Sequence, residues 1–281
     1  MKRCRATRLL VVWFLCGIPV VWAHSGKAII AIRTYTPMTI DGSLEDWVRR
    51  LESSNWTGQL DVKKGHVVEW IQAAPLDLNV LTSTVEAGMI TSPKDFSARA
   101  YFMWDAERFY AAAVVVDDEV VTQHEGADIW QDDALELWLD CRHDAVTHTL
   151  VQDDEYQLGV SPASRHRPRP VGWVWRNPEP EPVRAAMEVA SSLTPDGYLV
   201  ELAIPWAVLK GCQPKMGGVM GFNVSMVDKD EDQQWSHITW SGQLHSDPSQ
   251  FGHLYLVDAP IDLFPSDVFE HQAESSPAAS R

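Results

Sequence analysis

The sequence D-I-W-Q-D-D-A-L-E-L-W-L-D, residues Asp128–Asp140, changes within thirteen positions from an acidic loop into a strand. In its second half leucine alternates with other residues, and this period of two is typical of a strand that packs one face into a core. The leucines are Leu135, Leu137 and Leu139. The opposite face presents Glu136 and Trp138, and Trp130 lies in the loop that leads in. The stretch therefore predicts a core strand with a chemically distinctive second face.

An indole ring beside a fixed carboxylate suits a sugar, because a sugar ring has an apolar C–H face and a rim of hydroxyls. Trp130 lies in a polar loop between Asp128, Gln131 and Asp132, where a purely structural indole is less expected. We therefore interpret Trp130 as a stacking platform and expect Asp133 to anchor the start of the strand. Trp138 is ambiguous, because loops can cover its face.

The first 23 residues follow the pattern of a secretory signal peptide. A start with four basic residues precedes an apolar run, Leu9–Val21, and Ala23 closes a small-residue cleavage site. The run is too short for a confident membrane span. We expect a secreted or periplasmic protein with a folded domain over residues 24–258 and a flexible tail over 259–281, rich in Pro, Ser, Ala and acidic residues.

The charge balance narrows the range of partners. The whole chain has 23 Lys+Arg against 39 Asp+Glu, and without residues 1–23 it has 19 against 39, a net charge of −20. Such a surface repels nucleic acid and anionic membranes, and favours neutral or cationic partners or a divalent metal. Two cysteines, Cys141 and Cys212, follow the signal peptide, and either one disulfide or two free thiols fits them.

Short β patterns separated by turn residues recur along the chain, which predicts an all-β fold, an antiparallel sandwich with two short helices. The helices are predicted over Leu44–Leu51, with Ser43 as N-cap, and from Pro205 to Gly211. Residues 55–93 are less patterned and are interpreted as an elaborated hairpin or insertion. The predicted strands are Ala28–Arg33, Val67–Gln72, Ala98–Trp104, Phe109–Val116, Ala134–Asp140, Tyr156–Val160, Arg184–Ser191, Tyr198–Ile204, Met220–Val227, Gln234–Trp240 and His253–Val257.

The motifs of the common hydrolase, metalloprotease and nucleotide-binding families are missing from the sequence, so a non-catalytic protein is the favoured reading. The run from Asp228 to Asp232 places Asp228, Asp230 and Asp232 at alternate positions, as calcium loops often do. The glycine and closing glutamate of an EF-hand are missing, and a solvated hairpin turn explains the run slightly better than a metal site does.

Several histidines are scattered through the domain without a helical i, i+4 pair. A haem or transition-metal site would require two of them to converge in space. They are His124, His143, His148, His166, His237, His245 and His253.

Six motifs occur in the order in which the family 9 carbohydrate-binding modules carry them. They are I-D-G-S-L-E-D-W at Ile40–Trp47, W-D-A-E-R-F-Y-A-A-A at Trp104–Ala113, I-W-Q-D-D-A-L-E-L-W-L-D at Ile129–Asp140, Y-L-V-E-L-A-I-P-W at Tyr198–Trp206, G-F-N-V-S-M-V-D-K-D at Gly221–Asp230, and I-T-W-S…D-P-S-Q-F-G-H-L from Ile238 to Leu254. The chain resembles this family over roughly residues 37–257, with an interruption at 55–93.

The resemblance implies a jelly-roll β-sandwich that binds sugars, often as an accessory of xylan- or cellulose-degrading enzymes, with structural calcium. Sugar-binding members hold a terminal sugar between two tryptophans, and the first of these corresponds to Trp130. The carboxylate that contacts the sugar corresponds to Glu136, and the glutamine of the next strand to Gln157.

Two positions depart from the family pattern. His245 stands where the second tryptophan is expected, and Gly159 replaces an arginine, which removes a charged multi-donor group. We expect His245 to close the other side of the cleft, with Asn223 as a weaker candidate contact. The alternatives are a periplasmic haem-binding electron-transfer domain of the same sandwich type and a structural or surface module that has lost its ligand.

Overall fold

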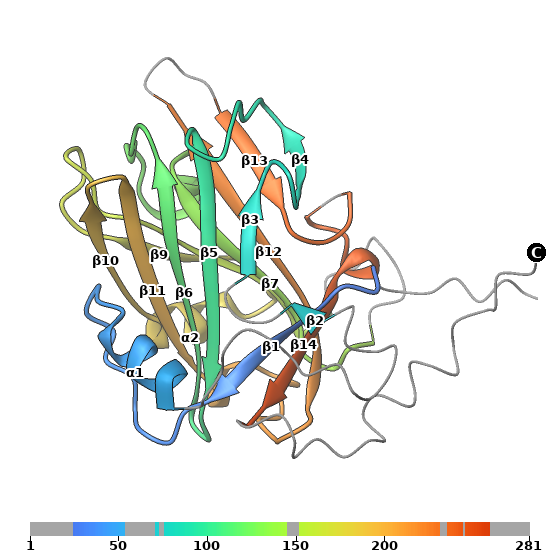
Figure 1. Cartoon of the computed structure of the whole chain (residues 1–281). Coiled ribbons are helices and arrows are strands. Elements are labelled where there is room, and N and C mark those ends of the chain that lie inside the picture. The colour runs from blue at the N-terminus through green and yellow to red at the C-terminus, as the bar shows by residue number, and fades with distance from the viewer. Residues whose placement is uncertain are drawn as a thin grey trace, which may run out of the picture.

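The computed structural model describes residues 25–53, 71–72, 76–144, 152–230, 235–243 and 245–258, without the side chains of 51–53 and 71–72. The predicted signal peptide, 1–23, and tail, 259–281, lie outside these residues, as does part of the predicted insertion. Most of the regular secondary structure in the described part is β-strand (Figure 1). The elements are β1 (Ala28–Arg33), α1 (Glu45–Ser53), β2 (Ile71–Gln72), β3 (Leu76–Asn79), β4 (Thr84–Ala87), β5 (Phe96–Trp104), β6 (Arg108–Asp117), β7 (Ala134–Asp140), β8 (Glu155–Ser161), β9 (Val171–Arg176), α2 (Pro180–Ala186), β10 (Glu188–Thr194), β11 (Gly197–Pro205), β12 (Val219–Lys229), β13 (Trp235–Thr239) and β14 (Gly252–Val257), with 3₁₀ helices at Gly126–Gln131, Trp206–Val208 and Pro248–Gln250.

Strand β7 has the bounds that the leucine alternation predicts. Leu135, Leu137 and Leu139 are fully buried in the main core, which confirms the inward face. The second face is also covered, since Glu136 and Trp138 are both buried. β7 is therefore an interior strand, paired with β12 on one side and β8 on the other.

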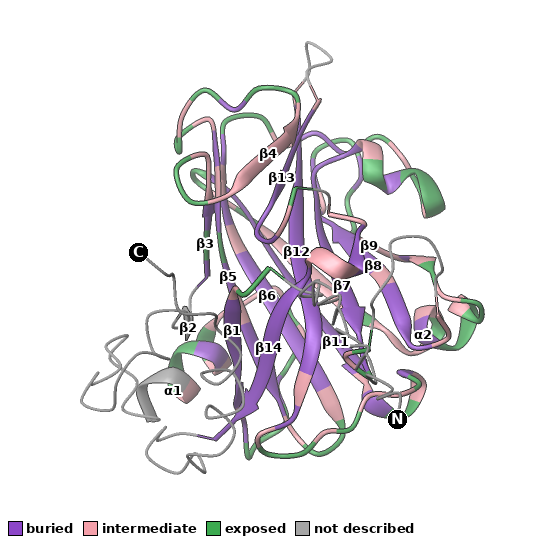
Figure 2. Cartoon of the chain, turned by 90° about the vertical axis from the view of Figure 1, so that its right-hand side faces the viewer, coloured by how far each residue is buried: buried purple, intermediate pink, exposed green. Residues whose placement is uncertain are grey.

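The strands form one strongly curved sheet in the order β10-β11-β6-β5-β1-β14-β12-β7-β8-β9. Its two ends approach each other, because Gly172 of β9 lies against Met187 and against Val189 of β10. A Cβ at Gly172 would stand 2.5 Å from Met187 Cε. The sheet thus nearly closes into a barrel-like sandwich around the core, with buried residues concentrated on the strands (Figure 2).

The predicted antiparallel pairing holds for most strands but is wrong at β1. This strand pairs in parallel with β14, β5 and the short β2. Parallel pairing is possible because long chain segments separate these strands, so no tight hairpin fixes their direction. The other pairs are antiparallel, including the β12–β13–β4 extension that carries part of the site described below.

The helices of the structure match the two predicted helices only in part. The first predicted helix corresponds to α1, whereas the segment after Pro205 forms only the 3₁₀ helix Trp206–Val208. Helix α2 was not predicted. It includes the first residues of the predicted strand Arg184–Ser191, so β10 begins later than predicted, at Glu188. Two prolines in the first turn of α2 obscure its pattern, although proline is well tolerated there. No helix among the described residues is long and apolar enough to cross a membrane.

A buried carboxylate holds α1 and its leading turn against β11. Glu201 Oε2 accepts the backbone N–H groups of Asp41, Gly42 and Ser43 at 3.2, 2.6 and 3.2 Å, and Oε1 accepts the Trp47 indole N–H at 2.7 Å. Gly42 has φ +83°, which favours glycine in this turn. This contact explains why the segments Ile40–Trp47 and Tyr198–Trp206 occur together.

A disulfide joins the end of β7 to the segment before β12. Cys141 and Cys212 are bonded, with their Cα atoms 4.5 Å apart and 71 positions apart in the sequence. The structure thereby decides between the two states that the sequence left open for these cysteines.

Candidate functional site

The second face of β7 belongs to a polar and aromatic face of the sheet. Register places Glu136 between Ser225 of β12 and Gly159 of β8, and Trp138 beside Gln157. Gln157 Nε2 and Ser225 Oγ each donate to Glu136 Oε2 at 3.4 Å. The carboxylate is therefore buried but hydrogen-bonded, as a buried charged group requires.

The 3₁₀ helix Gly126–Gln131 presents Trp130 at the edge of this face. Ile129 is fully buried, whereas 44% of Trp130 is exposed. The loop is anchored directly after it: Asp132 accepts the backbone N–H groups of Gln123 and His124, and Asp133 accepts those of Val121 and Lys229. Asp133 thus anchors the strand as predicted. The exposed indole is consequently held by a rigid support.

Aromatic rings connect Trp130 to the buried carboxylate. The ring of Trp235 lies edge-to-face with Trp130 at a centroid distance of 6.2 Å, and its N–H donates to the Trp130 carbonyl. Trp235 in turn stacks on His237 at 5.8 Å, with the rings 3° from parallel. His237 Nε2 lies 4.0 Å from Glu136 Oε2. The exposed platform and Glu136 therefore belong to one continuous cluster.

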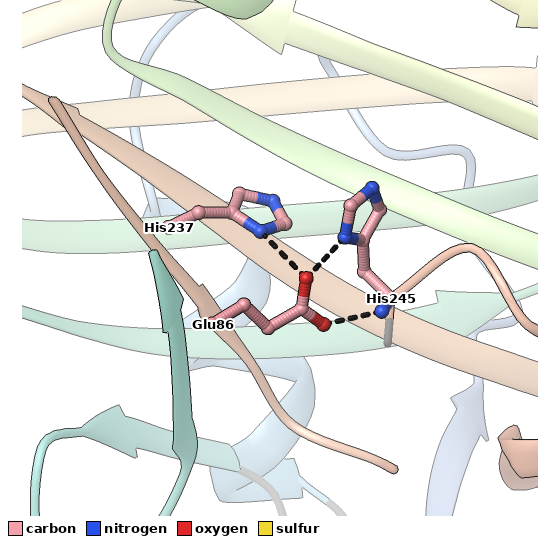
Figure 3. Close-up of side chains that lie close together, drawn as sticks. All are labelled: Glu86, His237 and His245. Carbon is pink, nitrogen blue, oxygen red and sulfur yellow. Dashed lines mark hydrogen bonds and ion pairs between the residues drawn. The ribbon is translucent and has the colours of Figure 1, made fainter. Parts of the chain in front are cut away.

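His245 faces inward instead of standing free opposite Trp130. Its Nδ1 pairs with Glu86 Oε2, and its backbone N–H donates to Glu86 Oε1 (Figure 3). Its ring packs edge-to-face at 5.0 Å from Trp138 and 4.3 Å from His237. Burial on its own raises the pKa of Glu86, but the hydrogen bonds and charges of the two histidines outweigh it and hold that pKa at about 2.

Trp175 occupies the space beside Gly159, where the family resemblance expects an arginine. A Cβ at Gly159 would stand 2.5 Å from the Leu135 carbonyl oxygen and 2.9 Å from the Trp175 ring, so a side chain there requires both the backbone and the indole to move. The Trp175 N–H donates to the Ala127 carbonyl at 2.7 Å, which ties this ring to the loop that carries Trp130. The missing arginine is thus matched by an aromatic ring in its place.

Of the predicted ligand contacts, the structure brings Glu136, Gln157 and His245 into one cluster and joins Trp130 to it through other rings. Asn223 does not belong with them. It is fully buried, and its amide donates to Thr239 and Ser241 and accepts from the backbone of Val224 and Ser241. Its side chain is used entirely within the fold.

The sequence analysis missed four residues of this cluster: Glu86, Trp175, Trp235 and His237. Trp175 lies on a strand that was not predicted, and Glu86 lies in the segment interpreted as an insertion. The sequence indicates only that a haem or transition-metal site would require two histidines to converge. His237 and His245 do converge. Their rings pack against each other with Glu86 beside them, which leaves no room between them for the plane of a haem.

Among the described residues, Asp228 is the only predicted metal ligand that belongs to a compact acidic cluster. Asp228 lies at the opposite face of β12 with Asp117 and Asp133, and one oxygen from each falls within 4.8 Å of the others. All three are buried, and burial is the main cause that raises the pKa of Asp117 and of Asp228 to about 8 and raises the pKa of Asp133 as well. Asp230 adds to the negative field at this cluster, whereas Asp232 lies outside the described residues.

Comparisons with known proteins agree with this architecture. Endo-1,4-beta-xylanase A of Thermotoga neapolitana is 28% identical over 181 residues, and Exoglucanase XynX of Acetivibrio thermocellus is 27% identical over 176 residues. These matches cover 62% and 61% of this chain, but the chain spans only 15% of the length of either relative.

Solved structures share the fold. A carbohydrate binding module family 9 from Caldicellulosiruptor kristjanssonii, in complex with cellotriose, aligns with a TM-score of 0.55 and 18% identity over 85% of this chain and 98% of that one. Its complex with glucose aligns with the same TM-score and identity over 85% of this chain and 100% of that one.

The model of the family described as "Carbohydrate family 9 binding domain-like" matches residues 68–259. This range contains all the strands that build the polar face, from β4 to β13. The match covers most of the chain, and the family is one of binding domains, not of catalytic domains. The chain belongs to the carbohydrate family 9 binding domain-like family.

Proposed function

We propose that the protein is an exported, non-catalytic domain that binds a saccharide at the edge of the polar face. The observation that carries the proposal is Trp130, an indole 44% exposed on a rigid loop and connected to a buried carboxylate. An aromatic ring of this kind covers the C–H face of a sugar, and neighbouring polar groups fix its hydroxyls.

The residues of the proposed saccharide site have different roles. Trp130 supplies the stacking surface. Gln157 is half-buried and placed to hydrogen-bond a sugar hydroxyl. Glu136 positions Gln157 through their 3.4 Å hydrogen bond and can accept a hydrogen bond from a sugar hydroxyl that reaches it. Trp175 and Trp235 supply further ring surface beside them. The role that the family pattern gives to a second tryptophan at position 245 falls to these rings instead, because His245 is turned toward Glu86.

The relatives support the ligand class. The solved modules hold cellotriose or glucose, and the curated relatives are xylanases and an exoglucanase that this chain matches over a small part of their length. A β-linked glucose or xylose chain is therefore the first ligand to test, and association with an enzyme that degrades such chains is the expected context.

Calorimetric titration with glucose, cellotriose and xylo-oligosaccharides tests the proposal, with wild type compared to Trp130→Ala. The variant keeps the backbone carbonyl that Trp235 bonds, so the neighbouring ring retains its partner. We expect at least tenfold weaker binding, which corresponds to about 1.4 kcal/mol.

The matched control is Tyr35→Ala. Tyr35 is 65% exposed and lines a separate hollow of about 450 Å³ near the Asp105–Arg108 turn, at the opposite end of β6 from the Trp130 loop. Unchanged binding in Tyr35→Ala supports the Trp130 site. Loss in Tyr35→Ala alone places the ligand in that hollow, and no binding of any saccharide by wild type indicates a structural module.

We further propose that Asp117, Asp133 and Asp228 hold a structural calcium ion. Asp133 already accepts two backbone N–H groups and Asp117 Oδ1 accepts one, but Asp117 Oδ2 and both oxygens of Asp228 are buried without a hydrogen-bond partner. Hard carboxylate oxygens are what Ca²⁺ prefers, and a bound ion would neutralise their mutual repulsion. Calcium is expected to raise the melting temperature of wild type and not that of Asp228→Asn.

Export is supported by the disulfide, because such bonds persist in oxidising compartments. Sequencing the amino terminus of the secreted protein tests it, with cleavage after Ala23 as the expected result.

A further inference from the structure

Two histidine rings from separate segments converge on one carboxylate oxygen of Glu86. Glu86 comes from β4, His237 from β13 and His245 from the loop after β13. Nδ1 of each histidine faces Glu86 Oε2, while Glu86 Oε1 accepts the His245 backbone N–H (Figure 3). The three candidate ligand atoms all lie within 4.8 Å of one another.

The pairing of β4 with β13, which contains a β-bulge, brings Glu86 to His237. His237 pairs with Ala87 and Ile238 with Val85, so Glu86 is an extra residue in β4 at that point. Val85 pairs with Ile238 and packs against the main core, so alternation along β4 turns the next residue, Glu86, to the opposite face, which carries His237. The bulge leaves Glu86 without a directly paired residue on β13, beside His237.

The cluster contains two buried carboxylates, whose charge has to be balanced by the histidines or by a bound cation. Glu86 and Glu136 are both almost completely buried, and across the described residues the only ion-pair partners of either are the histidines. Two buried carboxylates flank His237, one at each ring nitrogen, at 3.3 Å and 4.0 Å. Buried charges are normally paired or coordinate a metal.

We propose that Glu86, His237 and His245 form a binding site for a divalent transition metal of the zinc class. Two imidazole nitrogens and one carboxylate oxygen are a common zinc ligand set that leaves one position open. Ligands at about 2.0–2.1 Å from a tetrahedral ion are about 3.4 Å apart, and His237 Nδ1 lies 3.3 Å from Glu86 Oε2. His245 Nδ1 lies closer than that to the same oxygen, so this part-exposed side chain has to move back when an ion binds. The nitrogen donors separate this site from the all-oxygen aspartate cluster, which suits calcium.

The surroundings provide the outer contacts and the access that a metal site requires. The His245 backbone orients the second oxygen of Glu86, and Glu136 faces Nε2 of His237 when its Nδ1 binds a metal. The His245 side chain is 29% exposed, whereas those of Glu86 and His237 are 7% and 3% exposed. An ion can therefore enter beside His245, where the fourth position remains for water. This inference does not depend on sugar binding.

Zinc titration in the absence of sugar tests the site, using the full chain purified without a histidine tag and treated with a chelator. Wild type is compared with His245→Ala and Glu86→Gln, and the control is His166→Ala, an exposed histidine outside the cluster. We expect one high-affinity ion per chain in wild type and in the control, and at least 100-fold weaker binding in the two cluster variants. Circular dichroism confirms that each variant is folded, and His245→Ala removes a part-exposed loop side chain that the core does not require.

Cobalt provides a second readout, since Co²⁺ bound by two nitrogens and a carboxylate in a tetrahedral site absorbs visible light strongly. That absorption is expected in wild type and in His166→Ala and should disappear in His245→Ala. Equal zinc binding by wild type and His245→Ala, or cobalt binding without the tetrahedral spectrum, would overturn the proposal.

Discussion

Raising the pH from 5 to 7 in the presence of a chelator should lower the free energy of unfolding of this protein. The cause is the buried cluster of Asp117, Asp133 and Asp228, in which burial raises the pKa of Asp117 and Asp228 to about 8. An aspartate in the unfolded chain has a pKa near 4. Between about pH 4 and about pH 8 the folded protein therefore keeps protons that the unfolded protein has released.

The sign and the magnitude follow from linkage. Unfolding releases these protons in that window, so the stabilisation is complete below pH 4 and is lost as the pH rises through about 8. One such group lowers the free energy of unfolding by about 1.4 kcal/mol per pH unit. From pH 5 to pH 7 the loss is about 3 kcal/mol if the cluster retains one proton and about 5 kcal/mol if it retains two.

Urea unfolding at pH 5, 6 and 7 measures this loss, with wild type compared to Asp228→Asn and the exposed control Asp77→Asn. Asp228→Asn should show a slope shallower by about 1.4 kcal/mol per pH unit, whereas Asp77→Asn should follow wild type. Saturating calcium should remove most of the loss in wild type and in Asp77→Asn, but not in Asp228→Asn. A metal-free stability that is flat or rises with pH, with Asp228→Asn parallel to wild type, would refute the reasoning.

Two further changes test the supports of the fold by urea unfolding. Glu201→Ala leaves three backbone N–H groups and the Trp47 indole N–H without their acceptor, so it should lower the free energy of unfolding by about 3–5 kcal/mol. The control is Glu188→Ala, at an exposed ion pair with Arg108, which should change the free energy of unfolding by less than about 1 kcal/mol. Replacing Cys141 and Cys212 together by alanine opens a covalent link across 71 positions and should cost about 4 kcal/mol; a loss below about 1 kcal/mol would mean that the link contributes little in solution.

The parts of the fold that could be predicted are those with strong local alternation. β7 has one, so its bounds and its core face follow from the leucines alone. β9 includes Gly172, whose lack of a side chain admits Met187, and this need is invisible before the packing is known. The parallel pairs of β1 depend on partners far along the chain, and residue alternation carries no information about them.

The candidate site shows the same limit at the level of single residues. Alternation predicts that Glu136 and Trp138 share a face, and the polarity of the loop singles out Trp130. Nothing local predicts that Glu86 meets His237, because the pairing of β4 with β13 joins residues 151 positions apart. The bulge in that pairing is likewise specified by the tertiary fit and not by the sequence around it.

The two departures from the family pattern have structural counterparts, which argues against a site that has simply decayed. The space left by Gly159 is filled by Trp175, and His245 has a specific partner in Glu86. Loss of function without replacement would leave cavities or unpartnered polar groups at these positions. Instead, one change adds a ring beside Glu136 and the other completes a set of three metal-type ligands. The altered wall therefore keeps specific polar and aromatic partners, which is the arrangement that the proposed saccharide and metal sites require.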